Sequence, residues 1–311
     1  MTQRLMLLDS ASLYFRAFYG VPDQRRSPDE PPTNAVRGFL DMLATLIGTH
    51  HPTHLVACWD NDWRPAFRVD AIPTYKSHRL SEGSQIQEES PEDLTPQVPL
   101  IVDALQALGI ARIGSDGYEA DDVIGTLTQR ARGQQAVDIV TGDRDLFQLV
   151  DDEAGIRVLY TARGGVRDPD VVTQPFLQGK YSVSTGQAYA DMATLRGDTS
   201  DGLPGVAGIG EKTAATLINR YGDLASLRRA LAEGDPQIKG AQRQRLEAAS
   251  AYLDVAPGVV QVALDAPIPA FDAALPRQVG DVTLLSSLAS DYRLANHLNR
   301  VLGALGLGEN E

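Results

Sequence analysis

The sequence predicts an α/β protein with a central, mostly parallel sheet flanked by helices. Short apolar, β-rich segments alternate with longer segments of helical periodicity through the first half of the chain. A polar segment, residues 77–97, interrupts this alternation without a strong apolar period of its own. The alternation stops near residues 181–200, and helical segments joined by Gly-rich turns follow. We therefore expect an α/β core over residues 1–180, with an insertion at about 77–98, and a helical region over 181–311 that packs back on the core.

Seven segments carry this prediction. Four have the composition of buried strands, namely Leu5–Asp9, His54–Asp60, Val137–Thr141 and Ile156–Tyr160. Three have apolar residues at helical spacing, namely Thr33–Thr49, Pro99–Leu108 and Glu119–Arg130. The 77–97 segment is expected to be a surface excursion that is flexible or only partly helical.

The composition excludes several classes of protein. No run approaches the roughly 18 apolar residues of a membrane span, and the first ten residues lack the apolar core of a signal peptide. Cys58 is the only cysteine, which excludes an intramolecular disulfide and a Cys-rich metal site, so we expect a cytoplasmic protein. The formal net charge of −13 argues against a nucleic-acid partner, unless the acidic residues are concentrated at one place.

Acidic residues recur at similar topological positions. Asp9 and Asp60 end apolar strands, and Asp143 and Asp145 follow another. Two further groups lie at a helix start and before a Gly-rich turn, so the four groups together are Asp9, Asp60, Glu119, Asp121, Asp122, Asp143, Asp145, Asp198 and Asp201. Ligands of α/β sheets bind at the carboxyl ends of strands, so these acids are expected to converge there. Gathered carboxylates favour divalent cations such as Mg²⁺ or Mn²⁺. Helix capping remains an equal alternative for Glu119, Asp121 and Asp122.

Two further segments are candidates for anion binding. Arg68, Lys76 and Arg79 interleave with Phe67 and Tyr75, a pattern that suits phosphate contact and base stacking, although a solvated basic edge is the alternative. The second segment, GVAGIGEKTA (205–214), places glycines before a helix start, where backbone N–H groups bind anions. It is similar to a helix-hairpin-helix element that grips a DNA backbone, and an ordinary helix–helix turn is the alternative.

Taken together, the motifs resemble the bacterial 5′-nuclease family, meaning the 5′-3′ exonuclease domain of DNA polymerase I and its stand-alone flap endonuclease relatives. The resemblance rests on LLDSASLYFRAFYG (7–20), ACWDNDWRPAFRVDAIPTYKSHR (57–79), DGYEADDVIGTL (116–127), IVTGDRDLFQLV (139–150) and GDTSDGLPGVAGIGEKTA (197–214). It implies a PIN-like core with a helical arch in the insertion. A chain of 311 residues has no room for polymerase domains, so we expect a free-standing nuclease or an isolated nuclease module.

The resemblance also implies roles for individual residues. One metal group would comprise Asp9, Asp60, Glu119, Asp121 and Asp122, and a second would comprise Asp143, Asp145, Asp198 and Asp201. Arg68, Lys76 and Arg79 would contact the scissile phosphate and the 5′ strand. The hairpin over 205–221 would hold duplex DNA through Gly205, Gly208, Gly210, Lys212 and Thr213, with K⁺ bound by backbone carbonyls.

The implied activity is structure-specific hydrolysis of DNA by two or more Mg²⁺ or Mn²⁺ ions. The expected partner is DNA with a 5′ flap, a nick or a free 5′ end, the expected products carry a 5′-phosphate, and the protein is expected to be a monomer. Two alternatives stay open: a branched-DNA-binding protein without hydrolysis, and a PIN-type ribonuclease or phosphatase on a related core.

Overall fold

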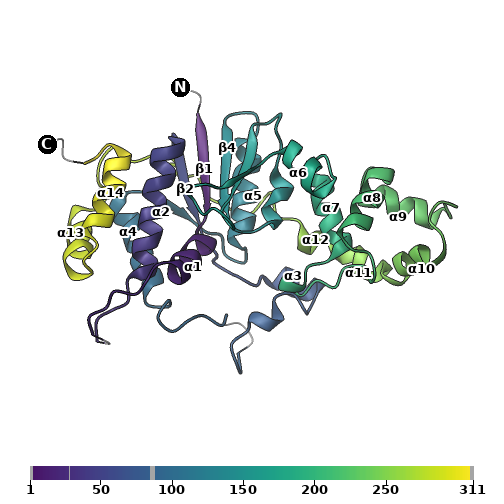
Figure 1. Cartoon of the computed structure of the whole chain (residues 1–311), viewed down its shortest axis with the longest axis horizontal. Helices are drawn as coiled ribbons and strands as arrows, with labels where there is room; N and C mark the ends of the chain where they lie inside the picture. The colour runs from purple at the N-terminus through teal and green to yellow at the C-terminus, as the bar shows by residue number, and fades with distance from the viewer. Residues whose placement is uncertain (1–2, 28, 85–87, 309–311) are drawn as a thin grey trace.

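The computed structural model describes residues 3–27, 29–84 and 88–308 (Figure 1). Over these ranges one six-stranded sheet forms, in the order β3-β2-β1-β4-β5-β6. Its strands are β1 (Arg4–Asp9), β2 (His54–Cys58), β3 (Ala111–Ile113), β4 (Ala136–Thr141), β5 (Ile156–Tyr160) and β6 (Asp170–Val172). All neighbouring strands are parallel except β5 and β6, which confirms the mostly parallel sheet. The strand β2 ends at Cys58, so Asp60 lies just beyond it rather than within it.

Both faces of the sheet are buried. Leu7 pairs with Val56 on one side and Ile139 on the other, and none of the three is exposed to solvent. Successive strand residues point to opposite faces, so Leu7 and Leu8 belong to different hydrophobic clusters. This explains why the central strands are apolar without alternation, as expected for a parallel sheet covered on both faces.

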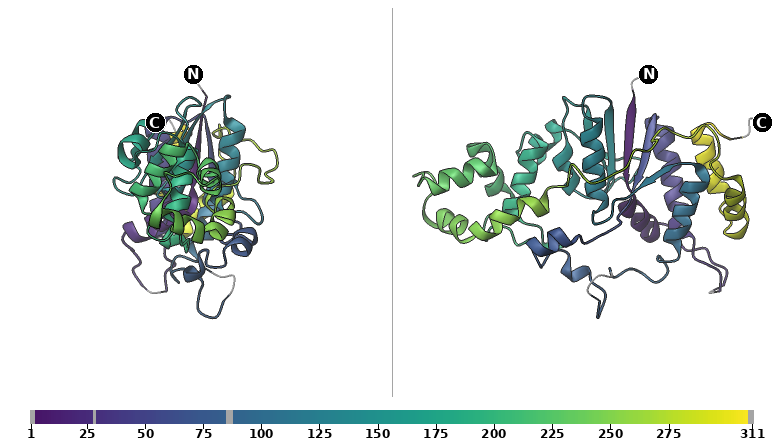
Figure 2. Two further views of the ribbon diagram at one scale, coloured as in Figure 1. Left: turned by 90° about the vertical axis from the view of Figure 1, so that its right-hand side faces the viewer. Right: turned by 180° about the vertical axis from the view of Figure 1, so that it is seen from behind.

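Helices cover the two faces (Figure 2). The cluster with Leu8 includes residues of α1 (Ser10–Gly20), α2 (Asn34–His50), α4 (Gln97–Leu108), α13 (Val282–Asp291) and α14 (Ala295–Leu305). The cluster with Leu7 includes residues of α5 (Ala120–Ala131), α6 (Gln174–Tyr181) and α7 (Gly186–Arg196). The last helix, α14, therefore packs on α2, near the start of the chain.

A group of helices extends away from the sheet at the end opposite α13 and α14 (Figure 1). It comprises α8 (Glu211–Tyr221), α9 (Leu224–Ala232), α10 (Gly240–Ala248), α11 (Ser250–Val255) and α12 (Pro257–Val260). The chain then returns along the core to α13. Nowhere in the described ranges is a helix both long and apolar enough to cross a membrane.

The insertion between β2 and α4 is mostly loop. It begins with α3 (Ala66–Ala71) and a short 3₁₀ helix, η1 (Ser77–Arg79), and an isolated bridge joins Leu80 to Glu88. Of the helical arch that the resemblance implies, the described residues between 77 and 96 contain only η1 at its base; residues 85–87 lie outside the described residues. Gly83, Pro91, Pro96 and closely spaced acidic side chains explain the lack of helix.

Candidate active site

A cavity of about 490 Å³ opens at the carboxyl ends of β1, β2 and β4. Parallel strands bring their ends to one edge of the sheet, and ligands of such folds bind there. Aromatic side chains, including Tyr14 and Trp59, form part of the wall. Five of the nine predicted acids line the cavity, namely Asp9, Asp60, Glu119, Asp121 and Asp143.

The local fold fixes the first two acids. Asp9 caps α1 by accepting a hydrogen bond from the Ser12 amide at 3.1 Å, and its second oxygen accepts one from the Thr141 hydroxyl at 2.7 Å. Asp60 accepts a hydrogen bond from the Ala120 amide, at the start of α5, at 2.8 Å. The Asp9–Ser12 bond is a local helix cap, whereas the Asp9–Thr141 and Asp60–Ala120 bonds join elements distant in the sequence, so the fold holds both acids in place.

The electrostatics of the cavity favour a cation. Burial, together with the neighbouring charges of Asp60 and Asp143, raises the pKa of Asp9 to about 7. Burial also raises the pKa of Asp60. Burial, followed by the charges of Asp9 and Asp143, raises the pKa of Asp121 well above its ordinary value. A divalent ion would relieve this repulsion, and carboxylate oxygens are ligands that Mg²⁺ and Mn²⁺ prefer.

The acids line the same cavity, but their carboxylates do not converge on a single metal position. Among the residues that the structure describes, no group of three or more His, Cys, Asp or Glu side chains is arranged to hold a metal ion. The donor chemistry and the raised pKa values fit divalent cations, and the side chains would have to move together to coordinate one.

The second predicted metal group lies on two loops beside the cavity. Asp143 is exposed, and it accepts a hydrogen bond from the Asp145 amide at 3.0 Å, at the start of the 3₁₀ helix η2 (Asp145–Leu149). Asp198 caps η3 (Thr199–Asp201) through the Ser200 amide at 2.8 Å. Burial, and then the charge of Asp143, raises the pKa of Asp145. The pKa of Asp201 is raised by burial.

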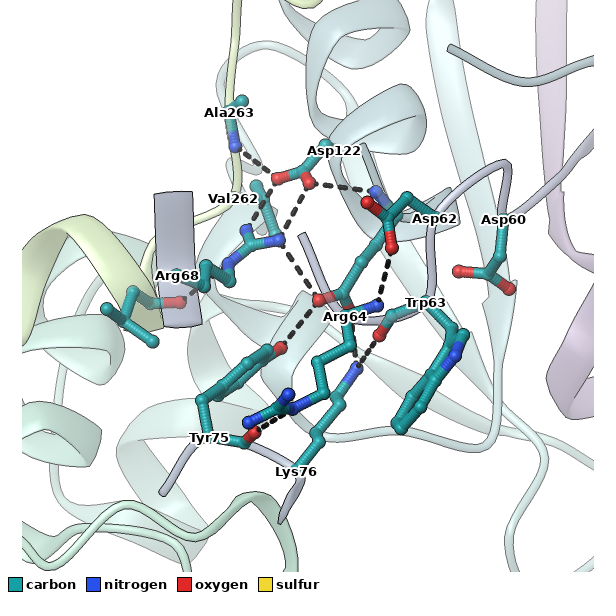
Figure 3. Close-up of polar contacts among 12 residues, drawn as sticks. Asp60, Asp62, Trp63, Arg64, Arg68, Tyr75, Lys76, Asp122, Val262 and Ala263 are labelled. Carbon is teal, nitrogen blue, oxygen red and sulfur yellow. Dashed lines mark hydrogen bonds and ion pairs between the residues drawn. The ribbon is translucent and has the colours of Figure 1, made fainter. Parts of the chain in front are cut away.

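Two predicted site residues, Asp122 and Arg68, do not line the cavity and lie instead in a buried network of hydrogen bonds (Figure 3). Asp122 is fully buried, and both its oxygens accept hydrogen bonds from Arg68, at 2.6 and 2.8 Å. The amides of Ala263, at 2.8 Å, and Glu119, at 3.1 Å, also donate to them. The Arg68 Nε donates to the Val259 carbonyl at 3.1 Å.

This network corrects the prediction for both residues. Neither residue lines the cavity, and the charge of Asp122 is offset by its buried pair with Arg68, so Asp122 is not placed to bind a metal and Arg68 is not placed to contact a phosphate. Glu119 and Asp122 form a capping box at the start of α5, which is the capping alternative left open by the sequence.

The cations Lys76 and Arg79 pair with predicted metal ligands. Lys76 is buried and donates to Glu119, which also accepts a hydrogen bond from the Tyr75 hydroxyl at 2.8 Å. Arg79 donates to Asp201 at 2.7 Å. The sequence pattern suggested that Tyr75 belongs to a surface that stacks bases. Tyr75 is buried, so it orients Glu119 instead.

Sequence reasoning did not identify the aromatic wall or the glycine that supports the insertion. Trp59 directly precedes Asp60, and that proximity was the available signal. Gly202 has φ +70°, and a Cβ atom there would overlap the Thr74 carbonyl. Thr74 in turn donates a hydrogen bond to the Gly202 carbonyl at 2.8 Å, which joins the insertion to the η3 loop.

The Gly-rich hairpin directly follows η3 along the chain and leads into α8. Gly205 and Gly208 have φ of +63° and +72°, and the Arg196 carbonyl leaves no room for a Cβ at Gly205. Gly210 precedes α8 and is exposed, as are Lys212 and Thr213 on its first turn. The turn therefore presents a helix N-terminus to solvent, with a lysine beside it.

Comparisons with known proteins agree with this architecture. Residues 4–181 match the family described as 5′-3′ exonuclease, N-terminal resolvase-like domain, and residues 184–281 match the 5′-3′ exonuclease, C-terminal SAM fold. A 5′-3′ exonuclease of Streptomyces coelicolor is 54% identical over 303 residues, which cover 96% of this chain and 99% of that protein. DNA polymerase I of Mycobacterium tuberculosis is 43% identical over 225 residues, covering 72% of this chain and 24% of the polymerase.

A solved structure shares the fold at low sequence identity. It is the bacteriophage T5 flap endonuclease in a pseudo-enzyme-product complex with DNA and metal ions, which is 16% identical, with a TM-score of 0.66, covering 98% of this chain and all of that one. The two family models together cover most of the chain and meet where the α/β core gives way to the helical region. The chain therefore belongs to the 5′-3′ exonuclease family.

Proposed function

We propose that this protein is a structure-specific 5′ nuclease, a 5′-3′ exonuclease and flap endonuclease that hydrolyses DNA phosphodiesters during replication and repair. One observation carries the proposal: five carboxylates line a single cavity at the strand ends, and the repulsion between their charges favours bound cations. Its family relatives bear the name 5′-3′ exonuclease, which supports the same activity.

The proposed cofactors are two or more Mg²⁺ or Mn²⁺ ions. Asp9, Asp60, Glu119, Asp121 and Asp143 would hold them from the cavity wall, with Asp145, Asp198 and Asp201 on the η2 and η3 segments. Bound divalent ions activate a water for attack and stabilise the leaving oxygen, giving 5′-phosphate products. Asp122 is left out of this set, because it does not line the cavity and its charge is paired with the buried Arg68.

The chain's own cations and aromatic side chains would position the substrate. Lys76 and Arg79 pair with Glu119 and Asp201, so coordination of those acids would free both cations to donate to the scissile phosphate. Tyr14 and Trp59 line the same cavity and offer a ring to stack on a base.

The hairpin would hold the duplex. Backbone N–H groups at Gly208 and Gly210, with Gly205 shaping the turn and Lys212 and Thr213 beside it, would bind a backbone phosphate, and backbone carbonyls would bind K⁺. The proposed substrate is DNA with a 5′ flap, nick or free 5′ end, and the proposed working form is a cytoplasmic monomer that acts at the nucleoid.

Cleavage of a 5′-flap DNA in Mn²⁺ tests the proposal, with single-stranded RNA as a parallel substrate and Asp143→Ala as the control variant. We expect flap cleavage that leaves a 5′-phosphate and that Asp143→Ala abolishes. Binding of the flap in a gel without any cleavage would instead identify a DNA-binding protein. Equal cleavage of RNA and flap DNA would identify a ribonuclease.

A further inference from the structure

A sixth carboxylate lines the acidic cavity, and it comes from the insertion instead of from the edge of the sheet. Glu88 lies among the lining residues, as do Arg79 at the base of the insertion and Trp63 just after β2. Glu88 does not belong to the nine acids that the family resemblance implies as metal ligands, and it follows no predicted strand. The proposed nuclease chemistry therefore leaves it without a role.

The backbone of the insertion holds Glu88 beside the base of that segment. An isolated bridge pairs Glu88 with Leu80, and the Glu89 amide donates to the Arg79 carbonyl at 2.8 Å. The Arg79 side chain in turn donates to Asp201, on the η3 segment, at 2.7 Å. The outgoing and returning parts of the insertion are thus joined next to the cavity, and Glu88 lies at the junction.

The Glu88 side chain presents its charge to the same space as the metal-binding acids. Among the described residues its carboxylate has no hydrogen-bond or ion-pair partner, although Glu88 is partly buried. Burial raises the pKa of this carboxyl, as does the negative charge of Asp60, whereas the positive charge of Arg79 lowers it. Burial also raises the pKa of Tyr14, another lining residue, together with the charges of Asp60 and Glu88. Glu88 and Asp60 therefore act on a common region of the cavity.

The cations of the cavity are already paired with other acids. Lys76 pairs with Glu119, and Arg79 pairs with Asp201. In the described part of the chain these two cations line the cavity together with six carboxylates, namely Asp9, Asp60, Glu88, Glu119, Asp121 and Asp143. Like charges at such short range disfavour joint ionisation. Glu88 therefore needs a positive partner that the lining residues do not supply.

A divalent metal ion has the chemistry of that partner. Mg²⁺ and Mn²⁺ prefer carboxylate oxygens, and Mg²⁺ keeps several of its waters in protein sites. A carboxylate can therefore join such a site by direct coordination or by accepting a hydrogen bond from a metal-bound water. Partners of the second kind still change metal affinity by about 10- to 100-fold.

We propose that Glu88 is a further carboxylate of the divalent-metal site, supplied by the insertion, and that bound metal fastens the insertion to the cavity. Binding of metal then stabilises the pairing of Glu88 with Leu80 beside Arg79. This inference rests on the proposed nuclease function, because that function requires the metal. Metal binding and the state of the insertion can nevertheless both be measured without DNA.

The first experiment titrates the unaltered protein with Mn²⁺ and follows tryptophan fluorescence. The chain has two tryptophans, Trp59 and Trp63, and both line the cavity, so quenching by the paramagnetic ion reports on this site. We expect Glu88→Gln to weaken Mn²⁺ binding by about tenfold, as for the loss of one outer partner of a metal. The matched control is Glu89→Gln, an exposed neighbour that does not line the cavity and should keep the affinity of the unaltered protein. Equal affinities of the two variants for Mn²⁺ overturn the proposal.

The second experiment measures hydrogen exchange of the Glu89 amide by NMR, with and without Mg²⁺. This amide bonds to the Arg79 carbonyl, so its exchange reports the opening of the insertion beside the cavity. Linkage is reciprocal, so a tenfold effect of Glu88 on metal affinity implies that Mg²⁺ slows this exchange by about tenfold in the unaltered protein. In Glu88→Gln we expect Mg²⁺ to leave the exchange unchanged. Exchange that Mg²⁺ slows equally in both proteins, or in neither, overturns the proposal.

Binding of a 5′-flap DNA in saturating Ca²⁺ distinguishes this role from simple repulsion of phosphate. If Glu88→Gln bound the flap more tightly than Glu89→Gln and kept full affinity for Mn²⁺, Glu88 would act on the DNA and not on the metal, which overturns the proposal. A failure of the nuclease function would appear separately, as absence of flap cleavage by the unaltered protein in Mn²⁺ that quenches its tryptophans.

Discussion

Two neighbouring carboxylates at the start of α5, Asp121 and Asp122, have opposite surroundings. Asp122 is fully buried, and Arg68, Ala263 and Glu119 satisfy both its oxygens. Asp121 lines the cavity, where burial and the charges of other acids raise its pKa. The comparison teaches that an acidic motif can divide between two tasks: Asp122 holds the wall together, and Asp121 remains available for a cation.

Replacing Asp121 tests the residue that lines the cavity, and it should have the largest effect on cleavage. We expect Asp121→Asn to reduce flap cleavage by about a thousandfold, in the range found when a group that stabilises developing charge is removed. Without metal, its melting temperature should stay the same or rise, because the amide removes repulsion with Asp9 and Asp143. Single-turnover cleavage and thermal unfolding measure the two effects. Cleavage within tenfold of the unaltered protein would contradict the assignment.

Replacing Asp122 tests the residue that lies in the buried network with Arg68. Asp122→Asn removes the bidentate partner of the buried Arg68 guanidinium and leaves only the pair with Glu119 at 3.2 Å, so we expect a cost of about 3 kcal/mol, the lower end of the range for breaking a buried pair. Urea unfolding measures that loss of stability. The matched control is Asp41→Asn, which removes a partly exposed partner of Arg300 and His297 and should cost about 1 kcal/mol or less. If both variants were equally stable, the buried network would not be structural.

The sequence predicted the acids that line the cavity better than it predicted the buried network around Asp122. Asp9 and Asp143 follow apolar strands, and the rule that parallel strands share an edge is enough to bring them together. Arg68 and Asp122 are 54 positions apart, and a third segment supplies the Ala263 amide. Local patterns carry no information about contacts between such distant positions, so Asp122 was grouped with the metal ligands and Arg68 with the residues that contact phosphate.

The insertion shows the same limit. Its lack of apolar periodicity predicted a surface excursion, and the described part is mostly loop. The contact between Thr74 and Gly202 joins positions 128 residues apart, and only the folded chain reveals it.

Divalent metal should change the pH dependence of stability by binding to the acids that line the cavity. The pKa of Asp9 is raised from 3.8 to about 7, so the folded protein binds protons more tightly than the unfolded chain. The contribution of Asp9 to stability without metal is therefore fully present below about pH 4 and is lost as the pH rises through 7. Mn²⁺ needs ionised carboxylates, so we expect it to raise the melting temperature at pH 8 and much less at pH 5. At a hundredfold excess over the dissociation constant the stabilisation is about 2.7 kcal/mol.

Thermal unfolding at the two pH values, with and without Mn²⁺, measures this linkage. Asp121→Asn should reduce the gain at pH 8, whereas Asp41→Asn should leave it unchanged. An equal gain at pH 5 and pH 8 would mean that the metal binds elsewhere than at these acids.

The smallest effect is expected where the insertion contacts the η3 loop. Gly202→Ala places a methyl group against the Thr74 carbonyl at φ +70°, and strain of this kind costs of order 1–3 kcal/mol. The matched control is Gly222→Ala, which is strained at φ +91° but meets no atom within 4 Å. Both variants place a side chain at positive φ, so the difference between their melting temperatures reports the overlap of the new methyl group with the Thr74 carbonyl. Because the Lys76 amide donates to the Asp201 carbonyl at 2.9 Å in the same contact, Gly202→Ala should also slow flap cleavage more than Gly222→Ala does. Equal cleavage by both variants would mean that the insertion and the acidic site act independently.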